Sequence, residues 1–323
     1  MGQVILSLLA EWKGRFTPFM EWLHVLKDKS VIKADFMAGL TVALVLVPQS
    51  MAYADLAKLP PYVGLYASFI PVVVASLFGS SRQLATGPVA MVSLMTAGAI
   101  GMLGLAEYSE GAMFYAAFLA IMVGVIQLLL GLFRLGVLVD FLSHPVIIGF
   151  TNAAALIIAS SQVSKLFGLT IEGKFEYHYD KVWAIIQAIP NTHLVTLLMG
   201  GLSIFILVYV KKVNPKLPNV LIAVVVCTLI SHFTGYAEKG GAVIGVVDSV
   251  LPAFQIPTID YTRIGELMMV AFMIALIGFV EAISVAKAIA SQTRQRLSAN
   301  QELVGQGLAN IAAGLFQAYP VSG

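Results

Sequence analysis

The sequence predicts an all-α membrane protein that crosses the bilayer many times. Of its 323 residues, 59% are hydrophobic and only 11% are charged, whereas a soluble domain carries about 25% charged residues. Several apolar runs of roughly 20 residues are long enough to cross a hydrocarbon core of about 30 Å. A membrane β-barrel would instead show short segments of alternating polarity, and no such segments are visible.

Nine apolar segments are predicted to span the membrane. They cover residues 35–52, 61–79, 88–105, 112–132, 144–163, 192–210, 218–234, 264–289 and 301–316. Ahead of them, residues 11–33 mix aromatic and basic residues with the spacing of an amphipathic helix on the membrane surface. The stretches 165–190 and 236–263 are polar enough to be loops. The glycine-rich run GQGLANIAAGLF (305–316) predicts close packing against a neighbouring helix.

The positions of lysine and arginine predict how these spans are oriented. If the nine spans alternate, the basic residues of the short loops fall on the side of the N-terminal segment; they are Arg82, Arg134, Lys211, Lys212, Lys216, Arg294 and Arg296. The opposite loops carry acids such as Glu107 and Glu110. Because basic residues are enriched in cytoplasmic loops, we expect a cytoplasmic N-terminus and residence in the plasma (inner) membrane.

Composition also excludes several classes of function. The net charge of +2 is too small to indicate a nucleic-acid partner, and the single cysteine excludes a disulfide framework. The five histidines lack the spacing of metal ligands, so we expect neither a metal nor a cofactor. An intramembrane enzyme would need a nucleophile–base pair or metal ligands at membrane depth. No histidine or cysteine is paired with an acid there, and we therefore expect no enzyme.

Two short proline-containing segments interrupt the apolar pattern in similar ways. They read ATGPVAM (85–91) and QAYPVSG (317–323). A polar residue precedes each proline by 39 residues, since Gln49 precedes Pro88 and Glu281 precedes Pro320 at this spacing. Under the predicted topology the helix after Pro88 runs outward, and the helix after Pro320 runs inward. This pattern predicts an inverted repeat, in which broken helices form a substrate site near the midplane.

The two interruptions are predicted to bind an anion. Irregular backbone at membrane depth is tolerated only where it lines a cavity or is buried in protein. With Gly87 ending one segment and Pro88 beginning a helix, the amides of Val89 and Ala90 have no acceptor in that helix. The helix macrodipole adds about half a positive charge, which favours an anion.

A second helix N-terminus at Val321 and Ser322 is expected to face the first. A simple kink in a packed helix is the alternative interpretation of Gly87 and Pro88.

Two polar residues of the first span are candidate substrate ligands. Gln49 and Tyr53 are four residues apart and therefore share a helix face. Pro48 is expected to break the helix beside them. They could offer neutral hydrogen-bond donors to an anion. Alternatively, Gln49 could satisfy the carbonyls freed by Pro48, with Tyr53 belonging to the aromatic belt at the interface.

Glu281 is the candidate for proton coupling. It follows ten uncharged residues in an apolar span, where a carboxylate costs about 2.5 kcal/mol or more. It should therefore face the protein interior, and desolvation favours its protonated form. Protonation as an anion arrives would remove the repulsion between like charges. Ser284 lies three residues on, on the same face, and is a further candidate. A structural ion pair with Lys287 or with another helix is the alternative.

At this point the residues resemble a known family. The block AGLTVALVLVPQSMAYADLAKLPPYVGLYASFIPVVVASLFGSSRQLATGPVAMVSL (38–94) closely resembles the sulfate permease (SulP) family of anion transporters. The blocks at 279–290 and 300–323 resemble later parts of the same family.

The resemblance implies a fold of two inverted repeats of seven segments, with half-helices at the third and tenth segments. It implies the following division: an N-terminal amphipathic, cytoplasmic segment (1–33), core-domain segments 1–4 (34–142), gate-domain segments 5–7 (143–235), an extracellular or periplasmic loop (236–263), and core-domain segments 8, 9 and the start of 10 (264–323). The second repeat is then truncated, without segments 11–14 or a STAS domain, and this chain alone is not expected to transport.

The resemblance also implies the function. Gln49 and Tyr53 fall at first-segment positions that line the site in sulfate-type members, and Glu281 falls at the acid associated with proton coupling. The expected activity is proton-coupled sulfate uptake by an elevator-like alternating-access mechanism, in a homodimer when complete. Its expected partners are the anion, protons and the lipid bilayer. Alternatives are bicarbonate, chloride or dicarboxylate transport, possibly coupled to sodium, a nucleobase permease, or a non-transporting scaffold or motor.

Overall fold

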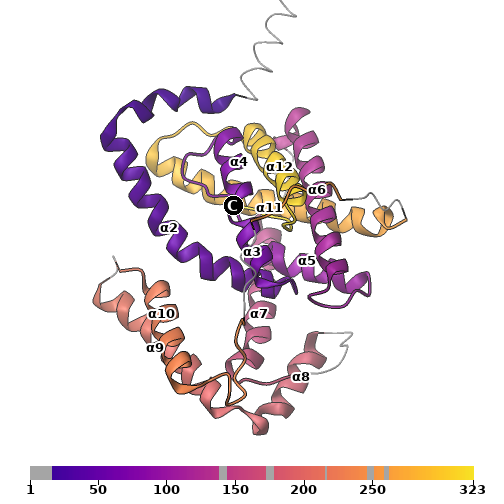
Figure 1. Ribbon diagram of the computed structural model, residues 1–323. Helices are drawn as coiled ribbons and strands as arrows, with labels where there is room; N and C mark the ends of the chain where they lie inside the picture. The colour runs from indigo at the N-terminus through magenta and orange to yellow at the C-terminus, as the bar shows by residue number, and fades with distance from the viewer. Residues whose placement is uncertain (1–16, 138–143, 172–177, 215–216, 246–250, 258–261) are drawn as a thin grey trace, which may run out of the picture. The chain divides into compact units, whose positions relative to one another are not determined.

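The computed structural model is built mainly from helices (Figure 1). It describes residues 17–137, 144–171, 178–214, 217–245, 251–257 and 262–323. The chain divides into two compact units. Unit 1 comprises residues 1–40, 49–143 and 248–323, and unit 2 comprises residues 41–48 and 144–247. Each unit is considered by itself.

Unit 1 holds most of the helices that concern the candidate site. They are α3 (Pro61–Ala67), α4 (Ile70–Phe78), α5 (Ala90–Met102), α6 (Glu110–Leu132), α11 (Ile264–Thr293), α12 (Ala299–Leu315) and both ends of α2 (Lys29–Leu56). Unit 2 holds α7 (His144–Leu166), α8 (His178–Ala188), the short 3-10 helix η4 (Ile189–Asn191), α9 (Leu194–Val213) and α10 (Asn219–Thr234).

Every predicted span overlaps a helix or, in one case, a pair of helices. Within the described residues, five apolar stretches are long enough to cross a bilayer: α2, α3 together with α4, α6, α9 and α11. Pro71 stands in the first turn of α4, and its ring excludes an uninterrupted helix from α3 because it would clash with the preceding turn. The prediction of an all-α polytopic membrane protein is confirmed.

Three local predictions were wrong. Residues 178–188 of the predicted loop form α8, an amphipathic helix too short to register as a span. The predicted surface helix at 11–33 is replaced, in its described part, by 3-10 turns η1 (Pro18–Glu21) and η2 (Leu23–Lys27), and α2 already begins at Lys29; residues 11–16 lie outside the described residues. Pro48 does not break its helix, because α2 runs through it without interruption.

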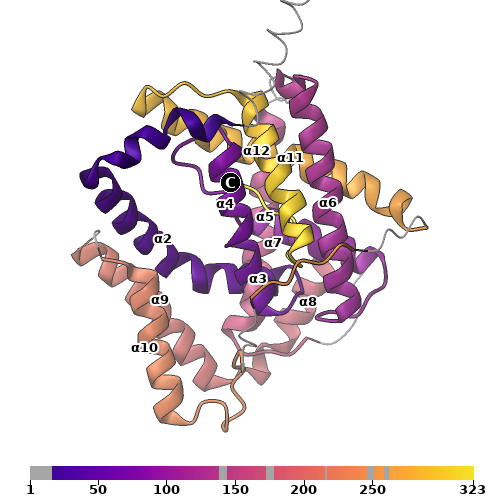
Figure 2. The ribbon, with the colours of Figure 1, turned by 45° about the horizontal axis from the view of Figure 1, so that its top comes forward.

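The core of unit 1 is formed where α12 packs against α6 and α4 (Figure 2). Glycines allow the close approach, as the run at 305–316 predicted. A Cβ on Gly307 would lie 2.6 Å from the backbone nitrogen of Leu128, and one on Gly305 would lie 2.6 Å from the Cα of Gly79. The helices therefore pack with backbone against backbone, which small residues make possible in a membrane.

Unit 2 contains a hairpin formed by α9 and α10, which pack against each other (Figure 1). Gly235 ends α10 in the left-handed conformation, with φ of 62°, which glycine adopts without strain. The hydroxyl of Tyr236 then meets Thr196 of α9 at 2.7 Å. This contact closes one end of the hairpin.

Candidate functional site

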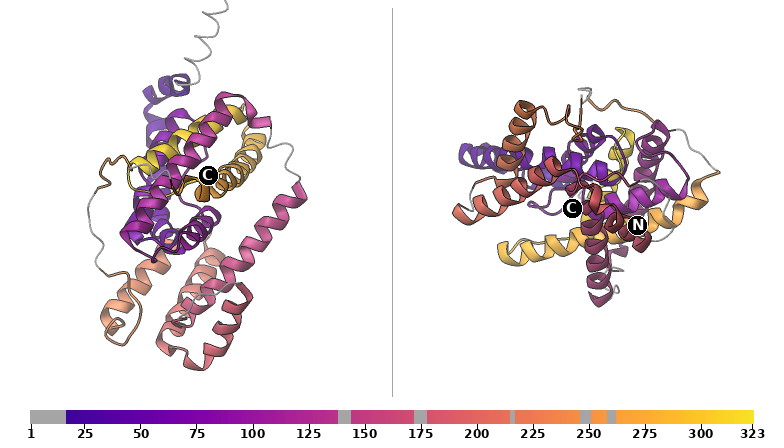
Figure 3. Two further views of the ribbon diagram at one scale, coloured as in Figure 1. Left: turned by 90° about the vertical axis from the view of Figure 1, so that its right-hand side faces the viewer. Right: turned by 90° about the horizontal axis from the view of Figure 1, so that it is seen from below.

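The two proline-containing interruptions cross each other inside unit 1. The backbone nitrogen of Gly87 donates to the carbonyl of Ser322 at 2.7 Å, and the nitrogen of Ser322 donates to the carbonyl of Gly87 at 2.9 Å. The resulting bridge is antiparallel, so the two segments run in opposite directions. The ribbon views show the chain ending within this unit, near α4, α11 and α12 (Figures 1 and 3).

The first interruption leads into α5 two residues later than predicted. The helix begins at Ala90, with Val89 as its extended N-cap residue, and Gly87 and Pro88 are buried ahead of it. The bridge explains the delay, because pairing at Gly87 keeps the backbone extended beyond Pro88. No side chain caps this N-terminus, and the amides of the first turn have no acceptor within the helix.

The second interruption differs from the prediction because its two amides are already occupied. The nitrogen of Val321 donates to Oδ1 of Asn310 at 2.8 Å, and that of Ser322 donates to Gly87. Both amides therefore serve the crossing itself, and the prediction that these two residues contact an anion stays a prediction. Pro320 itself is buried in the extended segment.

Asn310 is the residue that holds the second interruption in place. Its Nδ2 donates to the carbonyl of Val321 at 3.0 Å and to Oε1 of Gln127 at 2.9 Å. Gln127 of α6 in turn donates to the carbonyl of Ala275 in α11 at 3.2 Å. Both amide side chains are fully buried. One polar network thus connects α6, α11, α12 and the crossing.

Hydroxyl groups tie the crossing to α5 and α11. Ser93 Oγ and the Tyr319 hydroxyl lie 3.1 Å apart, with both residues fully buried. Ser322 Oγ donates to the carbonyl of Gly278 in α11 at 2.7 Å. A Cβ on Gly278 would lie 3.3 Å from Ser322 Oγ, so this part of α11 lies directly against the crossing.

Glu281 lies one turn beyond Gly278 on α11, and residues at this spacing share a helix face. It is half-buried, and its Oε2 is buried without a hydrogen-bond partner among the described residues. Ser284 is exposed, and its hydroxyl donates to the carbonyl of Val280 at 2.6 Å. Glu281 is therefore partly turned to the interior, whereas the Ser284 hydroxyl is used by the carbonyl one turn earlier in the same helix.

Gln49 and Tyr53 lie on one face of α2, as the spacing predicted. Nε2 of Gln49 donates to the Tyr53 hydroxyl at 2.9 Å. The adjacent Ala54 is fully buried in the same apolar cluster as Tyr319 and Val321. This end of α2 is therefore packed beside the second interruption.

Glu302 fixes the chain that leads towards α5. This buried carboxylate accepts hydrogen bonds at 3.0 Å from the nitrogens of Ser80 and Ser81 and from Ser80 Oγ. Nε2 of Gln301 adds a bond to the carbonyl of Phe78 at 2.6 Å. The first turn of α12 thus holds the turn that follows α4.

Sequence reasoning missed Asn310, Gln127, Tyr319 and Glu302. A signal for the first two was present, because an amide side chain within an apolar span is costly unless it has a partner. Glu302 resembles an ordinary acid in the first turn of a helix. Its partners are more than 200 residues away, so no local pattern marks it.

Two interrupted segments that pair antiparallel inside a packed helical unit are typical of the class of inverted-repeat membrane transporters. The sequence model of the "Sulfate permease family" matches residues 32–323 of this chain. The chain therefore belongs to this family. Its relatives include "Sulfate transporter 4.1, chloroplastic" of Arabidopsis thaliana, which is 37% identical over 98% of this chain and 46% of the relative. A probable sulfate transporter of Mycobacterium tuberculosis is 36% identical over 97% of this chain and 54% of the relative.

Solved structures show the same fold. Murine Solute Carrier 26 family member A9, an anion transporter in the inward-facing state, matches with a TM-score of 0.88 and 26% identity, over 97% of this chain and 55% of that one. The transmembrane domain of the cyanobacterial bicarbonate transporter BicA matches with a TM-score of 0.76 and 23% identity, over 92% of this chain and 75% of that one. The chain spans about half the length of the curated relatives that it matches.

Proposed function

We propose that this chain forms part of a secondary transporter that carries sulfate across the membrane together with a proton. The observation that carries the proposal is the crossing of the two interruptions beside Glu281. It places an uncapped helix N-terminus, a half-buried carboxylate and several hydroxyl groups within one packed unit. The names of the relatives, which are sulfate and anion transporters, favour an oxyanion as the cargo.

The anion would bind at the start of α5. The first-turn amides next to Val89 and Ala90 supply donors and the positive end of the macrodipole. Gln49 and Tyr53 would approach from α2. Val321 and Ser322 would shape the site by holding the extended backbone, since their amides serve the crossing. Ser284 would belong to the rim of the site.

Glu281 would couple proton movement to sulfate movement. Its buried Oε2 has no donor among the described residues, so a proton on this carboxyl would remove an uncompensated charge. A doubly charged anion arriving near an ionised Glu281 would be repelled, and protonation removes that repulsion. Binding of sulfate and binding of a proton would therefore favour each other.

We further propose that the working protein is a homodimer in the plasma (inner) membrane with a cytoplasmic N-terminus. The core segments at 34–142 and 264–323 would move against gate segments at 143–235 in an elevator-like cycle. The distribution of basic loop residues supports the orientation.

Uptake of labelled sulfate into vesicles tests the proposal. Purified full-length protein should accumulate sulfate when the proton gradient points inward, and much less without the gradient. Glu281→Gln should lose most of the gradient-driven uptake, because the carboxyl can no longer exchange a proton.

Glu266→Gln is a matched control on the same helix, since Glu266 is exposed and pairs with Arg263. It should keep the gradient response. Gradient-driven uptake that survives in Glu281→Gln would remove the coupling role. Competition by bicarbonate under sodium, without competition by sulfate, would reassign the cargo.

A further inference from the structure

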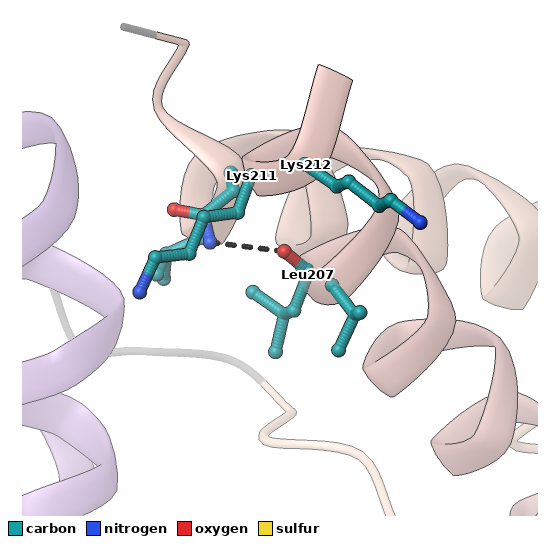
Figure 4. Close-up of a pocket in the computed structure, with 6 residues that line it drawn as sticks. Leu207, Lys211 and Lys212 are labelled. Carbon is teal, nitrogen blue, oxygen red and sulfur yellow. Dashed lines mark hydrogen bonds between the residues drawn. The ribbon is translucent and has the colours of Figure 1, made fainter. Parts of the chain in front are cut away.

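A groove with two lysines lies at the end of the α9–α10 hairpin in unit 2 (Figure 4). Its volume is about 580 Å³. The lining residues are Leu207, Val208, Lys211, Lys212, Asn219 and Val220. Figure 4 shows Lys211 and Lys212 leaving the same turn of helix in different directions, next to Leu207. The groove is open to its surroundings, and none of the residues that line it is acidic.

The groove follows from the way in which the hairpin is joined. Nδ2 of Asn219, the first residue of α10, donates to the carbonyl of Leu207 at 3.2 Å. This bond holds the start of α10 against the last turns of α9. The side chains of Leu207, Val208 and Val220 line the same groove as the two lysines and form its apolar part.

Among the described residues that line the groove, the two charged side chains are both basic. Lys211 and Lys212 occupy the last turn of α9, and the first turn of α10 opens at the same end of the hairpin with the positive end of its macrodipole. Lysines in a last turn also stabilise their own helix. That effect accounts for the lysines but not for an apolar groove between two helices beside them.

The combination of basic and apolar residues in one groove selects the occupant. A soluble anion would use only the lysines. A phospholipid with an anionic headgroup would place its phosphate at the lysines and its acyl chain along α9, an apolar helix with a mean hydropathy of 2.1. Val208 is 63% exposed and would be covered by such a chain.

We propose that this groove binds the headgroup of an anionic phospholipid from the cytoplasmic leaflet. Basic pockets between helices on the cytoplasmic side are suited to such headgroups, and that leaflet carries the anionic lipids. The choice of the cytoplasmic leaflet rests on the proposed orientation of the chain. The proposal does not depend on which anion the transporter carries.

Binding of phosphatidylglycerol to the purified full-length protein tests the site. In neutral detergent, native mass spectrometry should count bound phosphatidylglycerol at concentrations where phosphatidylcholine does not bind. The double variant Lys211→Gln/Lys212→Gln should bind phosphatidylglycerol roughly tenfold more weakly, because each basic residue near an anionic surface contributes appreciably. Lys239→Gln, which removes an exposed charge beyond the other end of α10, should bind like the wild type.

Three outcomes would overturn the proposal. Equal affinity of the double variant and the wild type would mean that the lysines do not hold the lipid. Displacement of the lipid by equimolar inorganic phosphate would identify a soluble-anion site. Absence of bound lipid in both proteins would mean that another part of the protein covers the groove. Because the readout is binding, loss of sulfate uptake would not produce any of these results.

Discussion

Units 1 and 2 hold their helices together in different ways. In unit 1, α12 meets α6 so closely that glycines on both helices touch backbone atoms of the other. In unit 2, α9 has no buried residue and α10 has one, Ala223. Unit 1 therefore has a buried core, whereas most side chains of the α9–α10 hairpin are not buried within unit 2.

The difference shows where a membrane protein can place buried polar groups. In unit 1, the amides of Asn310 and Gln127 have partners on three helices, and the surrounding packing excludes water, which strengthens each hydrogen bond. The α9–α10 hairpin is mostly apolar, with side-chain hydrogen bonds near its two ends, from Asn219 to the carbonyl of Leu207 and between Thr196 and Tyr236. Because lipid is as apolar as the apolar side chains of the hairpin, these side chains need no network.

The largest expected effect concerns the network of unit 1. Asn310→Leu keeps the approximate shape but removes the partner of the Val321 backbone and of Oε1 of Gln127. Each buried group left unsatisfied costs about 1–3 kcal/mol, so we expect a loss of ~3 kcal/mol or more in unfolding free energy. A large drop in the thermal unfolding midpoint of the purified protein would measure it.

The control for this change is Gln317→Leu, which removes a solvent-accessible amide pair with Gln255. It should change the unfolding free energy by less than about 1 kcal/mol. Similar midpoints for Asn310→Leu and Gln317→Leu would mean that the buried network contributes no more than an exposed pair.

A pair of glycine substitutions tests the comparison of the units directly. A Cβ on Gly124 of α6 would lie 2.6 Å from the backbone of Gly307 and Ile311, whereas one on Gly201 of α9 would meet nothing within 4 Å. Gly124→Ala should destabilise the protein by about 1–3 kcal/mol through overpacking. Gly201→Ala should be neutral or stabilising by up to about 1 kcal/mol, because alanine favours helix.

The same thermal unfolding measurement distinguishes the two substitutions. If Gly124→Ala were as stable as Gly201→Ala, α6 and α12 would be able to move apart enough to admit a methyl group without loss of stability. The contrast between the units would then lie in their polar groups alone.

The sequence was sufficient for the helices that underlie the predicted spans and for the two interruptions, because apolar length and proline are local signals. Glu281, Gln49 and Tyr53 were singled out in the same way, as polar residues at membrane depth, and their roles stay predictions. The antiparallel bridge between Gly87 and Ser322 was not predicted, since it joins residues 235 positions apart. The occupied amides of Val321 and Ser322 follow from this bridge and from Asn310. The local sequence pattern thus indicated which polar residues and prolines interrupt the apolar spans, but the partners of these residues depend on tertiary packing.

The smallest expected effect on the unfolding free energy concerns the exposed edge of unit 1. Substitutions there should be tolerated as well as substitutions in the hairpin of unit 2. Between α5 and α6, the Tyr108 hydroxyl donates to Oδ1 of Asp55 at 2.7 Å. Partial burial, and secondly the charge of Glu107, raise the pKa of Tyr108 above its ordinary value of 10.0. Since the unfolded chain loses this proton first, the stabilisation is complete below pH 10 and is lost as the pH rises through the higher folded-state pKa.

Tyr108→Phe should therefore lose only about 0.5–1 kcal/mol at pH 8, as expected for one exposed hydrogen bond. Thermal midpoints of the variant should also fall less steeply than those of the wild type between pH 10 and pH 11.5. Parallel curves over this range would mean that other groups cause the alkaline loss of stability. If Tyr108→Phe lowered the thermal midpoint at pH 8 as much as Asn310→Leu does, the edge of unit 1 would tolerate substitution no better than its interior.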